Sequence, residues 1–335
     1  MKALRLHGPN DLRLHDEPRP VPGPGEVLVR VTGAGICGSD LHWLSEGGIG
    51  DARLTRPLVL GHEFAGVIET GERQGERVAA DPAIPCGRCG SCREGNPHLC
   101  SMLRFAGHEA EDGAMRQFVA WPAAALHSLP EALSDADGAM LEPLGVAIHA
   151  VDLGQVRHGM SAAVFGCGPL GLLVLQVART AGATCIIATD RLPHRLEAAQ
   201  SLGAARALQI RNGRVTGDVL AATGGRGVDV AFEVAGENAA VETAIASTRP
   251  GGRVVLVGIP ADDRTLFTTS IARRKELTVV LSRRMKHTYP RAIELVASRQ
   301  VDVRSLVTHR FSLAQFDEAF RTAQLRQGLK VILES

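Results

Sequence analysis

The pattern of apolar and polar positions changes character near residue 160. Before that point, β-branched runs are short and are separated by many Gly and Pro residues, as at 26–32, 64–69 and 77–80. Short β-branched runs bounded by turn residues are typical of strands. This part of the chain therefore predicts a compact, loop-rich β domain.

From residue 161 the pattern predicts a parallel α/β sheet. Strands that alternate with helices need crossover connections, which make the strands parallel. The final stretch, 280–335, holds one helical segment near 289–298 and two strand-like runs, and we expect it to return to the first domain. The expected strands are 162–166, 185–190, 228–234 and 253–258, and the expected helices are 171–182, 193–203 and 237–252.

Length and charge narrow the classes of protein. A chain of 335 residues exceeds the size at which one hydrophobic core usually stops growing, which predicts two domains. The net charge of +1 is spread along the chain, so nothing indicates binding to nucleic acid or to an anionic membrane. We expect a small-molecule partner.

Neither the start of the sequence nor its most apolar stretch has the pattern of a signal peptide or a membrane span. The first twenty residues have no apolar h-region, and the most apolar stretch, 162–178, holds three glycines and a proline. We therefore expect a cytoplasmic protein. Seven cysteines, four of them within fifteen residues, fit thiolate metal ligands better than disulfides in such a chain.

A glycine-rich turn at 166–171 indicates a dinucleotide site. Gly166, Gly168 and Gly171 form G-C-G-P-L-G between a predicted strand and a predicted helix, with Pro169 and Leu170 opening the helix. Such glycines allow a tight turn and close approach of a pyrophosphate to the helix N-terminus. An ordinary turn between strand and helix remains the alternative.

Asp190 bears on the choice of cofactor. It ends the next predicted strand, 19 residues after Gly171, where a ribose-binding acid is expected. A carboxylate accepts hydrogen bonds from the 2′-hydroxyl but repels a 2′-phosphate, which favours NAD over NADP. Arg191 and Arg195 are close enough in sequence to offset part of that repulsion.

Two groups of residues suggest metal sites. Cys86, Cys89, Cys92 and Cys100 have spacers short enough for four sulfurs to meet around one ion, which is typical of a closed structural zinc site within a lobe at about 84–102. A redox pair or an iron–sulfur cluster is the alternative.

The second group is Cys37, His62 and Glu63. Spacing alone leaves open a buried thiol and an ordinary core histidine, but glycines flank these residues and Asp40 could orient an imidazole. A mixed set of sulfur, nitrogen and oxygen ligands is typical of catalytic zinc. Together with the dinucleotide turn, this set indicates metal-assisted hydride transfer.

Several segments together resemble the zinc-dependent medium-chain dehydrogenases across essentially the whole chain. They are GICGSDLHW, PLVLGHEFAG, the four-cysteine lobe, EPLGVAIHA and GCGPLG; within the superfamily, SDLHW, LEPL and LVTHRF look most like the polyol dehydrogenases, the sorbitol and L-idonate group. The resemblance implies an α/β fold with a GroES-like catalytic domain at 1–143 and 280–335 and a doubly wound Rossmann NAD domain at 144–279.

The resemblance also implies roles for single residues. Two zinc ions per subunit are expected, one catalytic and one structural. Cys37, His62 and, in the polyol branch, Glu63 match catalytic zinc ligands, and Glu142 matches a glutamate near the metal or its water. Ser39 and His42 match a proton relay. The alternatives are a carboxylate at a helix start for Glu142, a helix N-cap for Ser39 and a surface histidine for His42.

Cofactor and substrate residues carry over in the same way. The cofactor set comprises Gly166, Gly168, Pro169, Leu170, Gly171, Asp190, Arg195, Val257, Gly258, Ile259, Ser282 and Arg283. The substrate set comprises Trp43, Phe105, Glu142 and Arg284. Arg283 replaces an apolar residue of the family, so a substrate with a carboxylate is one reading and contact with cofactor phosphate or solvent is the other.

The function that this resemblance implies is oxidation of a secondary alcohol of a polyol or sugar acid to the ketone, with hydride transfer to NAD. An enzyme like L-threonine 3-dehydrogenase, or another secondary-alcohol dehydrogenase, is the second reading, and a zinc-stabilised relative without catalysis is a third. By analogy we expect a homo-oligomer, with a tetramer favoured and a dimer as the alternative.

Overall fold

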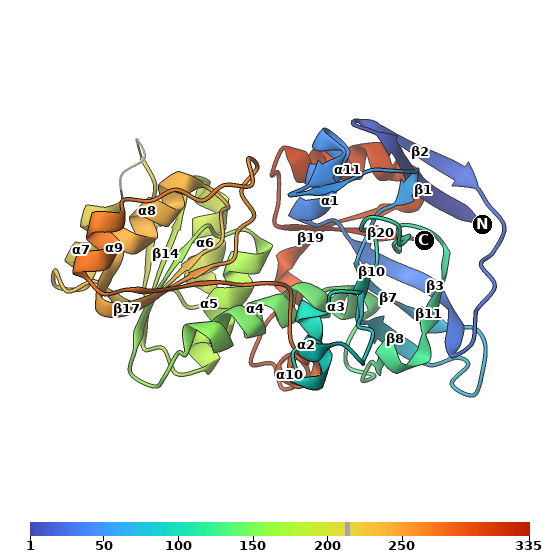
Figure 1. Ribbon diagram of the computed structural model, residues 1–335, viewed down its shortest axis with the longest axis horizontal. Helices are drawn as coiled ribbons and strands as arrows, with labels where there is room; N and C mark the ends of the chain where they lie inside the picture. The colour runs from blue at the N-terminus through green and yellow to red at the C-terminus, as the bar shows by residue number, and fades with distance from the viewer. Residues whose placement is uncertain (212–214) are drawn as a thin grey trace. The chain divides into compact units, whose positions relative to one another are not determined.

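The computed structural model describes residues 1–211 and 215–335, which divide into two compact units (Figure 1). Unit 1 comprises residues 1–143, 289–299 and 303–335, and unit 2 comprises 144–288 and 300–302. Unit 2 extends beyond the expected boundary at residue 280, because strand β18 (Thr278–Leu281) pairs with strand β17 in the parallel sheet.

The main sheet of unit 1 has seven strands in the order β12-β8-β7-β3-β20-β19, and β11 also pairs with β3. The expected strands at 26–32, 64–69 and 77–80 are present, and the last two strands of the chain belong to the same sheet. These strands are β3 (Glu26–Gly35), β7 (Glu63–Ile68), β8 (Arg77–Ala80), β11 (Phe118–Pro122), β12 (Leu126–Ser128), β19 (Val307–Ser312) and β20 (Lys330–Glu334).

Smaller sheets and short helices complete unit 1. Its apolar core includes Phe64 and Trp121, whose rings meet edge to face, and the indole N–H donates to the Asp81 carbonyl at 2.9 Å. The remaining strands are β1 (Lys2–Gly8), β2 (Asp11–Asp16), β4 (Gly48–Ile49), β5 (Ala52–Arg53), β6 (Leu58–Val59), β9 (Ala83–Ile84) and β10 (Arg104–Phe105); the helices are α1 (Gly38–Glu46), α2 (Gly90–Arg93), α3 (Asp135–Ala139), α10 (Tyr289–Ala297) and α11 (Phe316–Gln324).

Unit 2 contains a six-stranded, fully parallel sheet, which confirms the predicted α/β fold. The strands lie in the order β15-β14-β13-β16-β17-β18. The chain therefore runs outward from β13 on one side and outward from its parallel neighbour β16 on the other, and the order of the connections reverses between these two strands. The elements are β13 (Ser161–Phe165), β14 (Cys185–Asp190), β15 (Arg206–Gln209), β16 (Val228–Glu233), β17 (Thr248–Leu256), α5 (Pro169–Thr180), α6 (Pro193–Ser201), α7 (Thr216–Ala222), α8 (Asn238–Ser247) and α9 (Thr269–Arg274); α4 (Leu141–Gly154) begins in unit 1 and continues into unit 2.

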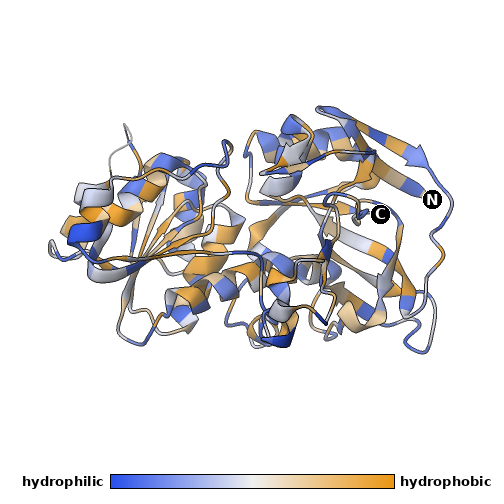
Figure 2. Ribbon diagram, in the orientation of Figure 1, coloured by the Kyte–Doolittle hydropathy of each residue, from blue (hydrophilic) through white to orange (hydrophobic). Residues whose placement is uncertain are grey.

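Helices cover the parallel sheet on both faces. One face packs with α7, α8 and α9 into a single apolar cluster that contains Phe165, Val219 and Ile245, while α5 lies against β13 and β14 on the other side (Figure 1). Figure 2 colours the parallel strands and much of α5 as hydrophobic. No helix in the described ranges is long and apolar enough to cross a membrane.

One predicted helix is shorter in the structure than expected. The pattern predicts helix over 237–252, but α8 ends at Ser247 and β17 begins at Thr248. Pro250 cannot donate a helical hydrogen bond, and two glycines follow it. Lys275 then caps the helix end, because its ammonium group donates to the carbonyls of Ala246 at 2.6 Å and Thr248 at 2.7 Å.

Candidate active site

Three candidate metal ligands converge in unit 1. Cys37 follows the end of β3, and His62 and Glu63 lead into β7, the antiparallel neighbour of β3. Because Gly35 pairs with Glu63, the two connecting segments meet. The Cys37 sulfur, a His62 ring nitrogen and a Glu63 carboxylate oxygen all lie within 4.8 Å of one another.

The buried carboxylate of Asp40 holds both segments in place. It accepts the N–H of Cys37 at 2.9 Å and that of Gly61 at 3.3 Å, and its Oδ1 lies 3.7 Å from Nδ1 of His62. A carboxylate behind an imidazole orients the ring and leaves its other nitrogen for a metal. Gly61 has a φ of +94°, and a Cβ there would lie 2.8 Å from the Met115 side chain.

The donor set fits a divalent cation. Burial, together with the charge of Glu63, raises the pKa of the Cys37 thiol to about 12. Burial also raises the pKa of Glu142, at the start of α4, to about 8. A divalent cation would favour the ionised forms of both groups, and zinc accepts sulfur, nitrogen and carboxylate ligands. Glu142 interacts electrostatically with His62 and Glu63 but lies outside the three-atom cluster.

A buried lysine beside the cluster was not expected from the sequence. Lys330, the first residue of β20, forms an ion pair with Glu63, and the two side chains are 4% and 1% exposed. Its charge also acts on Cys37 and Asp40. The only signal in the sequence was a lysine directly before an apolar run. The pairing of β20 with β3 is what brings this lysine next to Glu63.

Ser39 and His42 lie on α1, for which Cys37 is the N-cap. The Ser39 side chain acts on the Cys37 sulfur and lowers the pKa of that thiol, against the larger effect of burial. His42 is one turn further along, 26% exposed, with Nδ1 3.1 Å from a carboxylate oxygen of Glu46. A hydroxyl beside the cluster and an imidazole nearer the surface therefore lie on one helix.

Four rings form a row that starts at the metal cluster. The ring of His62 lies 5.4 Å from that of Phe105, which lies 6.3 Å from His108, which lies 5.4 Å from Trp43, each measured between centroids. The sequence-based substrate residues Trp43 and Phe105 are buried, whereas His108 is 22% exposed. His108 was not expected from the sequence, since only folding brings it between the two aromatic rings.

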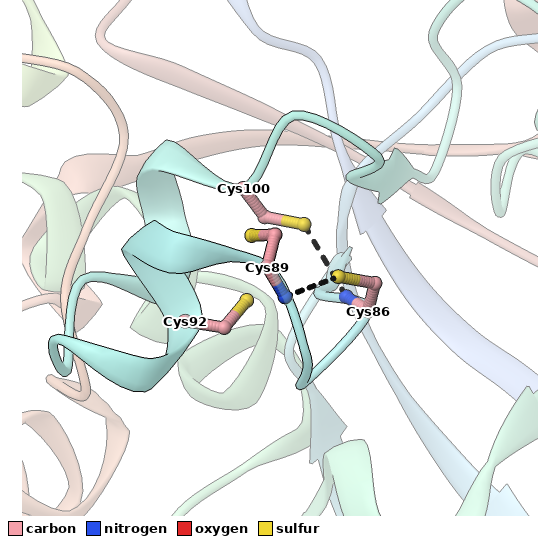
Figure 3. Close-up of side chains that lie close together, drawn as sticks. All are labelled: Cys86, Cys89, Cys92 and Cys100. Carbon is pink, nitrogen blue, oxygen red and sulfur yellow. Dashed lines mark hydrogen bonds between the residues drawn. The ribbon is translucent and has the colours of Figure 1, made fainter.

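The four-cysteine lobe gathers four sulfurs around one point (Figure 3). Helix α2 carries Cys92, Cys89 is its N-cap, and a short 3₁₀ turn at Pro97–Leu99 leads to Cys100. Backbone N–H groups already donate to sulfur, from Cys89 to Cys86 at 3.4 Å and from Cys86 to Cys100 at 3.3 Å. Hydrogen bonds from the backbone N–H and side chain of Cys92 lower the pKa of Cys89 to about 6, which favours thiolate. Four sulfur donors in this arrangement suit zinc.

The glycine-rich turn in unit 2 requires glycine at two of its positions. A Cβ on Gly171 would lie 1.9 Å from the Gly166 carbonyl oxygen, so α5 can approach the turn this closely only with glycine there. Gly166 has a φ of +101°. A Cβ on Gly168 would meet only the Arg195 guanidinium, at 3.6 Å, and Pro169 and Leu170 begin α5.

Asp190 ends β14 beside this turn. Its carboxylate accepts the N–H of Cys167 at 2.8 Å and of Leu192 at 2.9 Å, and Arg195 Nη1 lies 3.9 Å away. Each carboxylate oxygen can accept a further hydrogen bond, so a ribose hydroxyl can still bind. Arg191 instead pairs with Glu237.

The other cofactor candidates follow the next two strands of the sheet. Val257, Gly258 and Ile259 follow β17, and Ser282, Arg283 and Arg284 follow β18, at the edge where ligands bind in such sheets. The Ser282 hydroxyl is buried, and no described group hydrogen-bonds to it. Arg284 adopts a φ of +53°.

Comparison with known proteins shows which family the chain belongs to. Residues 23–131 match the alcohol dehydrogenase GroES-like domain, and residues 169–298 match the zinc-binding dehydrogenase domain. Sorbitol dehydrogenase of Bacillus subtilis is 37% identical over 329 residues, which cover 96% of this chain and 93% of that protein. The chain belongs to the zinc-dependent medium-chain dehydrogenases. Within that family it is a polyol dehydrogenase, as the sequence resemblance predicted.

Solved structures of this dehydrogenase family share the fold. The short chain alcohol dehydrogenase rspB of Escherichia coli CFT073, complexed with NADH, has a TM-score of 0.91 at 31% identity and covers 100% of this chain and 99% of its own. L-idonate 5-dehydrogenase of Escherichia coli has a TM-score of 0.89 at 28% identity, covering 100% and 98%. These likenesses confirm the GroES-like and Rossmann parts, and the family works with zinc and NAD or NADP.

Proposed function

We propose that this dehydrogenase transfers hydride from a secondary alcohol of a polyol or sugar acid to NAD, giving the ketone. The observation that carries the proposal is the cluster of Cys37, His62 and Glu63 in a chain that also carries the dinucleotide turn. Relatives named sorbitol dehydrogenase and a structural neighbour named L-idonate 5-dehydrogenase support the two substrate classes.

The chain's own residues divide the work at the catalytic site. A zinc ion held by Cys37, His62 and Glu63 would polarise the substrate hydroxyl and lower its pKa. Asp40 keeps the His62 ring in one orientation. The Ser39 hydroxyl accepts the proton that the substrate loses and passes a proton toward His42, which is open to solvent.

We assign the four-cysteine lobe to a second, structural zinc ion, which gives two zinc ions per subunit. Four thiolates close the coordination shell and leave no position for substrate. Support comes from the four sulfurs lying within 4.8 Å of one another and from the N–H donors aimed at them.

NAD is the proposed cofactor in preference to NADP. Asp190 is buried at the end of β14, so a 2′-phosphate there would meet a carboxylate. Arg191 is already paired with Glu237, which leaves it less available to a phosphate. The affinity ratio of the two cofactors for the purified protein checks this preference directly.

The substrate residues favour polyols and admit sugar acids. Trp43 and Phe105 lie in the aromatic row beside His62, and Glu142 interacts electrostatically with the same histidine. Arg283 and Arg284 follow β18, where a guanidinium can bind a carboxylate. We further propose a cytoplasmic homo-oligomer, a tetramer rather than a dimer, which sedimentation of the purified protein distinguishes; the seven free thiols fit a reducing compartment.

A substrate panel tests the proposal. Sugar alcohols, aldonates, L-threonine and simple alcohols are compared by NADH absorbance, and zinc per chain is measured on the same protein. We expect the highest kcat/KM with a polyol or an aldonate and about two zinc ions per chain. Threonine as the best substrate would overturn the substrate class, and one zinc without NAD binding would indicate a non-catalytic relative.

A further inference from the structure

We infer that Glu233 is a positioning residue for the dinucleotide, because its side chain fixes the loop at 234–237 against the segments proposed to hold the cofactor. The inference rests on the proposed cofactor role of Gly166 and of residues 257–259. Glu233 itself contacts neither substrate nor cofactor and acts through the loop.

Glu233 lies at the centre of the ligand-binding edge of the parallel sheet. It is the last residue of β16 and is 1% exposed. It pairs with Phe165 at the end of β13 on one side and with Leu256 at the end of β17 on the other. Strand order reverses between β13 and β16, which is where such sheets bind ligands.

Hydrogen bonds tie this one residue to two loops. Its carboxylate Oε1 accepts the N–H groups of Ala235 and Gly236, both at 2.8 Å. Its main-chain oxygen accepts the N–H groups of Val257 at 2.8 Å and Gly258 at 3.1 Å. The loop after β16 and the segment after β17 are therefore held by the same residue.

Close packing leaves these segments no room to shift separately. A Cβ on Gly166 would lie 2.9 Å from the Ala235 nitrogen, and a Cβ on Gly236 would lie 2.4 Å from the Ile259 oxygen. A Cβ on Gly258 would lie 2.1 Å from the Gly236 nitrogen. A displaced 234–237 loop would thus press on the phosphate turn and on the 257–259 segment at once.

The opposite end of the same strand provides a matched control. Asp229, four residues earlier on β16, is also a buried carboxylate, but Arg226 and Arg249 pair with it at 2.8 and 2.6 Å. It lies at the amino end of the strand, away from the edge that binds ligands. Loss of Asp229 should therefore affect stability without affecting cofactor binding.

Glu233→Ala, Glu233→Asp and Glu233→Gln are compared with Asp229→Ala in the zinc-loaded enzyme. NADH affinity is measured by fluorescence titration, alongside zinc content, thermal unfolding and separate KM values for NAD and for the polyol. We expect Glu233→Ala to lower the affinity for NADH at least about tenfold, because the N–H groups of Ala235 and Gly236 lose a charged acceptor and the loop is no longer held. The KM for NAD should rise with it, while the zinc content and the KM for the polyol stay unchanged.

The other variants complete the test. Glu233→Gln retains a carbonyl acceptor and should bind NADH within about threefold of the unmodified enzyme. Glu233→Asp shortens the side chain by one methylene and should also lower the affinity for NADH. This variant keeps the test informative if the alanine variant does not fold. NADH affinity unchanged in both Glu233→Ala and Glu233→Asp, or reduced equally in Asp229→Ala, overturns the inference. An unmodified enzyme that does not bind NADH overturns the proposed function instead.

Discussion

At the scale of single residues, Lys330 pairs with Glu63 inside unit 1, and its positive charge also acts on Asp40 and Glu142. The pair that it forms with Glu63 is almost fully buried. Removing one partner of such a pair leaves a charge in an apolar interior with nothing to compensate it. The lysine therefore stabilises the acidic ligand set before any metal is bound.

Lys330→Met should lower the free energy of unfolding of the metal-free protein by about 3 to 5 kcal/mol. Zinc supplies positive charge at the same place, so the loss should be smaller in the zinc-loaded protein. Denaturant unfolding of both forms measures the difference, with Lys330→Arg as the variant that retains the charge. Equal stability of Lys330→Met and the unmodified metal-free protein would contradict this account.

The lowered pKa of the Asp229 carboxyl predicts that stability depends on pH. Burial acts to raise the pKa of this carboxyl, but hydrogen bonds from Arg226, Ser161 and Arg249 outweigh it and hold the pKa far below its ordinary value. Because the folded pKa lies below the unfolded one, the stabilisation is fully present above about pH 5, starts to fall as the pH drops through the unfolded pKa of about 4, and is lost only as the pH falls through the folded pKa, well below 3.

Asp229→Asn should therefore lower Tm at pH 7, and as the pH falls from 7 toward about 2 the difference in Tm should start to shrink below about pH 4, because the unfolded chain then gains a proton at Asp229 that the folded protein does not yet bind. Thermal unfolding of both proteins across that range gives the difference in Tm at each pH. A difference that stays constant with pH would show that the carboxylate charge is not the cause.

The aromatic and charged residues of the site differ in how far sequence could predict them. Cys37 lies in one recognisable segment and His62 and Glu63 lie in another, and glycines flank the residues in both, so their proximity was expected. Lys330 stands directly before an apolar run, but nothing near Lys330 or His108 in the sequence shows that the first pairs with Glu63 and the second contacts Trp43.

At the scale of elements, the turn between β13 and α5 depends on Gly171. Gly171→Ala would bring a Cβ within 1.9 Å of the Gly166 oxygen and must displace either the turn or the helix. We expect NADH affinity to fall at least about tenfold, because the pyrophosphate site is built by that turn. Fluorescence titration checks the affinity.

Gly217→Ala is the control for this substitution. Gly217 lies in α7, and a Cβ there has no neighbour within 4 Å. Alanine should stabilise the protein by about 0.5 to 1 kcal/mol and leave NADH affinity unchanged. Unimpaired cofactor binding in Gly171→Ala would mean that the turn does not hold the dinucleotide.

At the scale of the whole molecule, we expect loss of one metal cluster to affect turnover and loss of the other to affect stability. Cys37→Ser should remove one zinc and lower kcat by at least about a thousandfold, the cost of losing Lewis-acid assistance, while Tm changes little. Cys92→Ser should also remove one zinc but lower Tm, because a closed structural site contributes folding free energy. Zinc analysis, kinetics and calorimetry on both variants distinguish the two; the same profile in both would contradict the assignment.

Sequence alone determined the parts of this protein that depend on local order along the chain. Alternating strand and helix patterns gave the parallel sheet, short spacers gave the four-cysteine cluster, and several segments in the right order gave the family. Each strand, helix, spacer or segment among these signals is made of neighbouring residues, where backbone geometry and side-chain reach set the outcome.

Only the tertiary structure decided what depends on distant segments meeting. It put Lys330 against Glu63, placed His108 between Phe105 and Trp43, kept β18 in the second unit and packed the loop after Glu233 against Gly166 and Ile259. The physical reason is that buried charges and close backbone contacts are satisfied by partners that strand pairing supplies, and one sequence does not show which strands will pair.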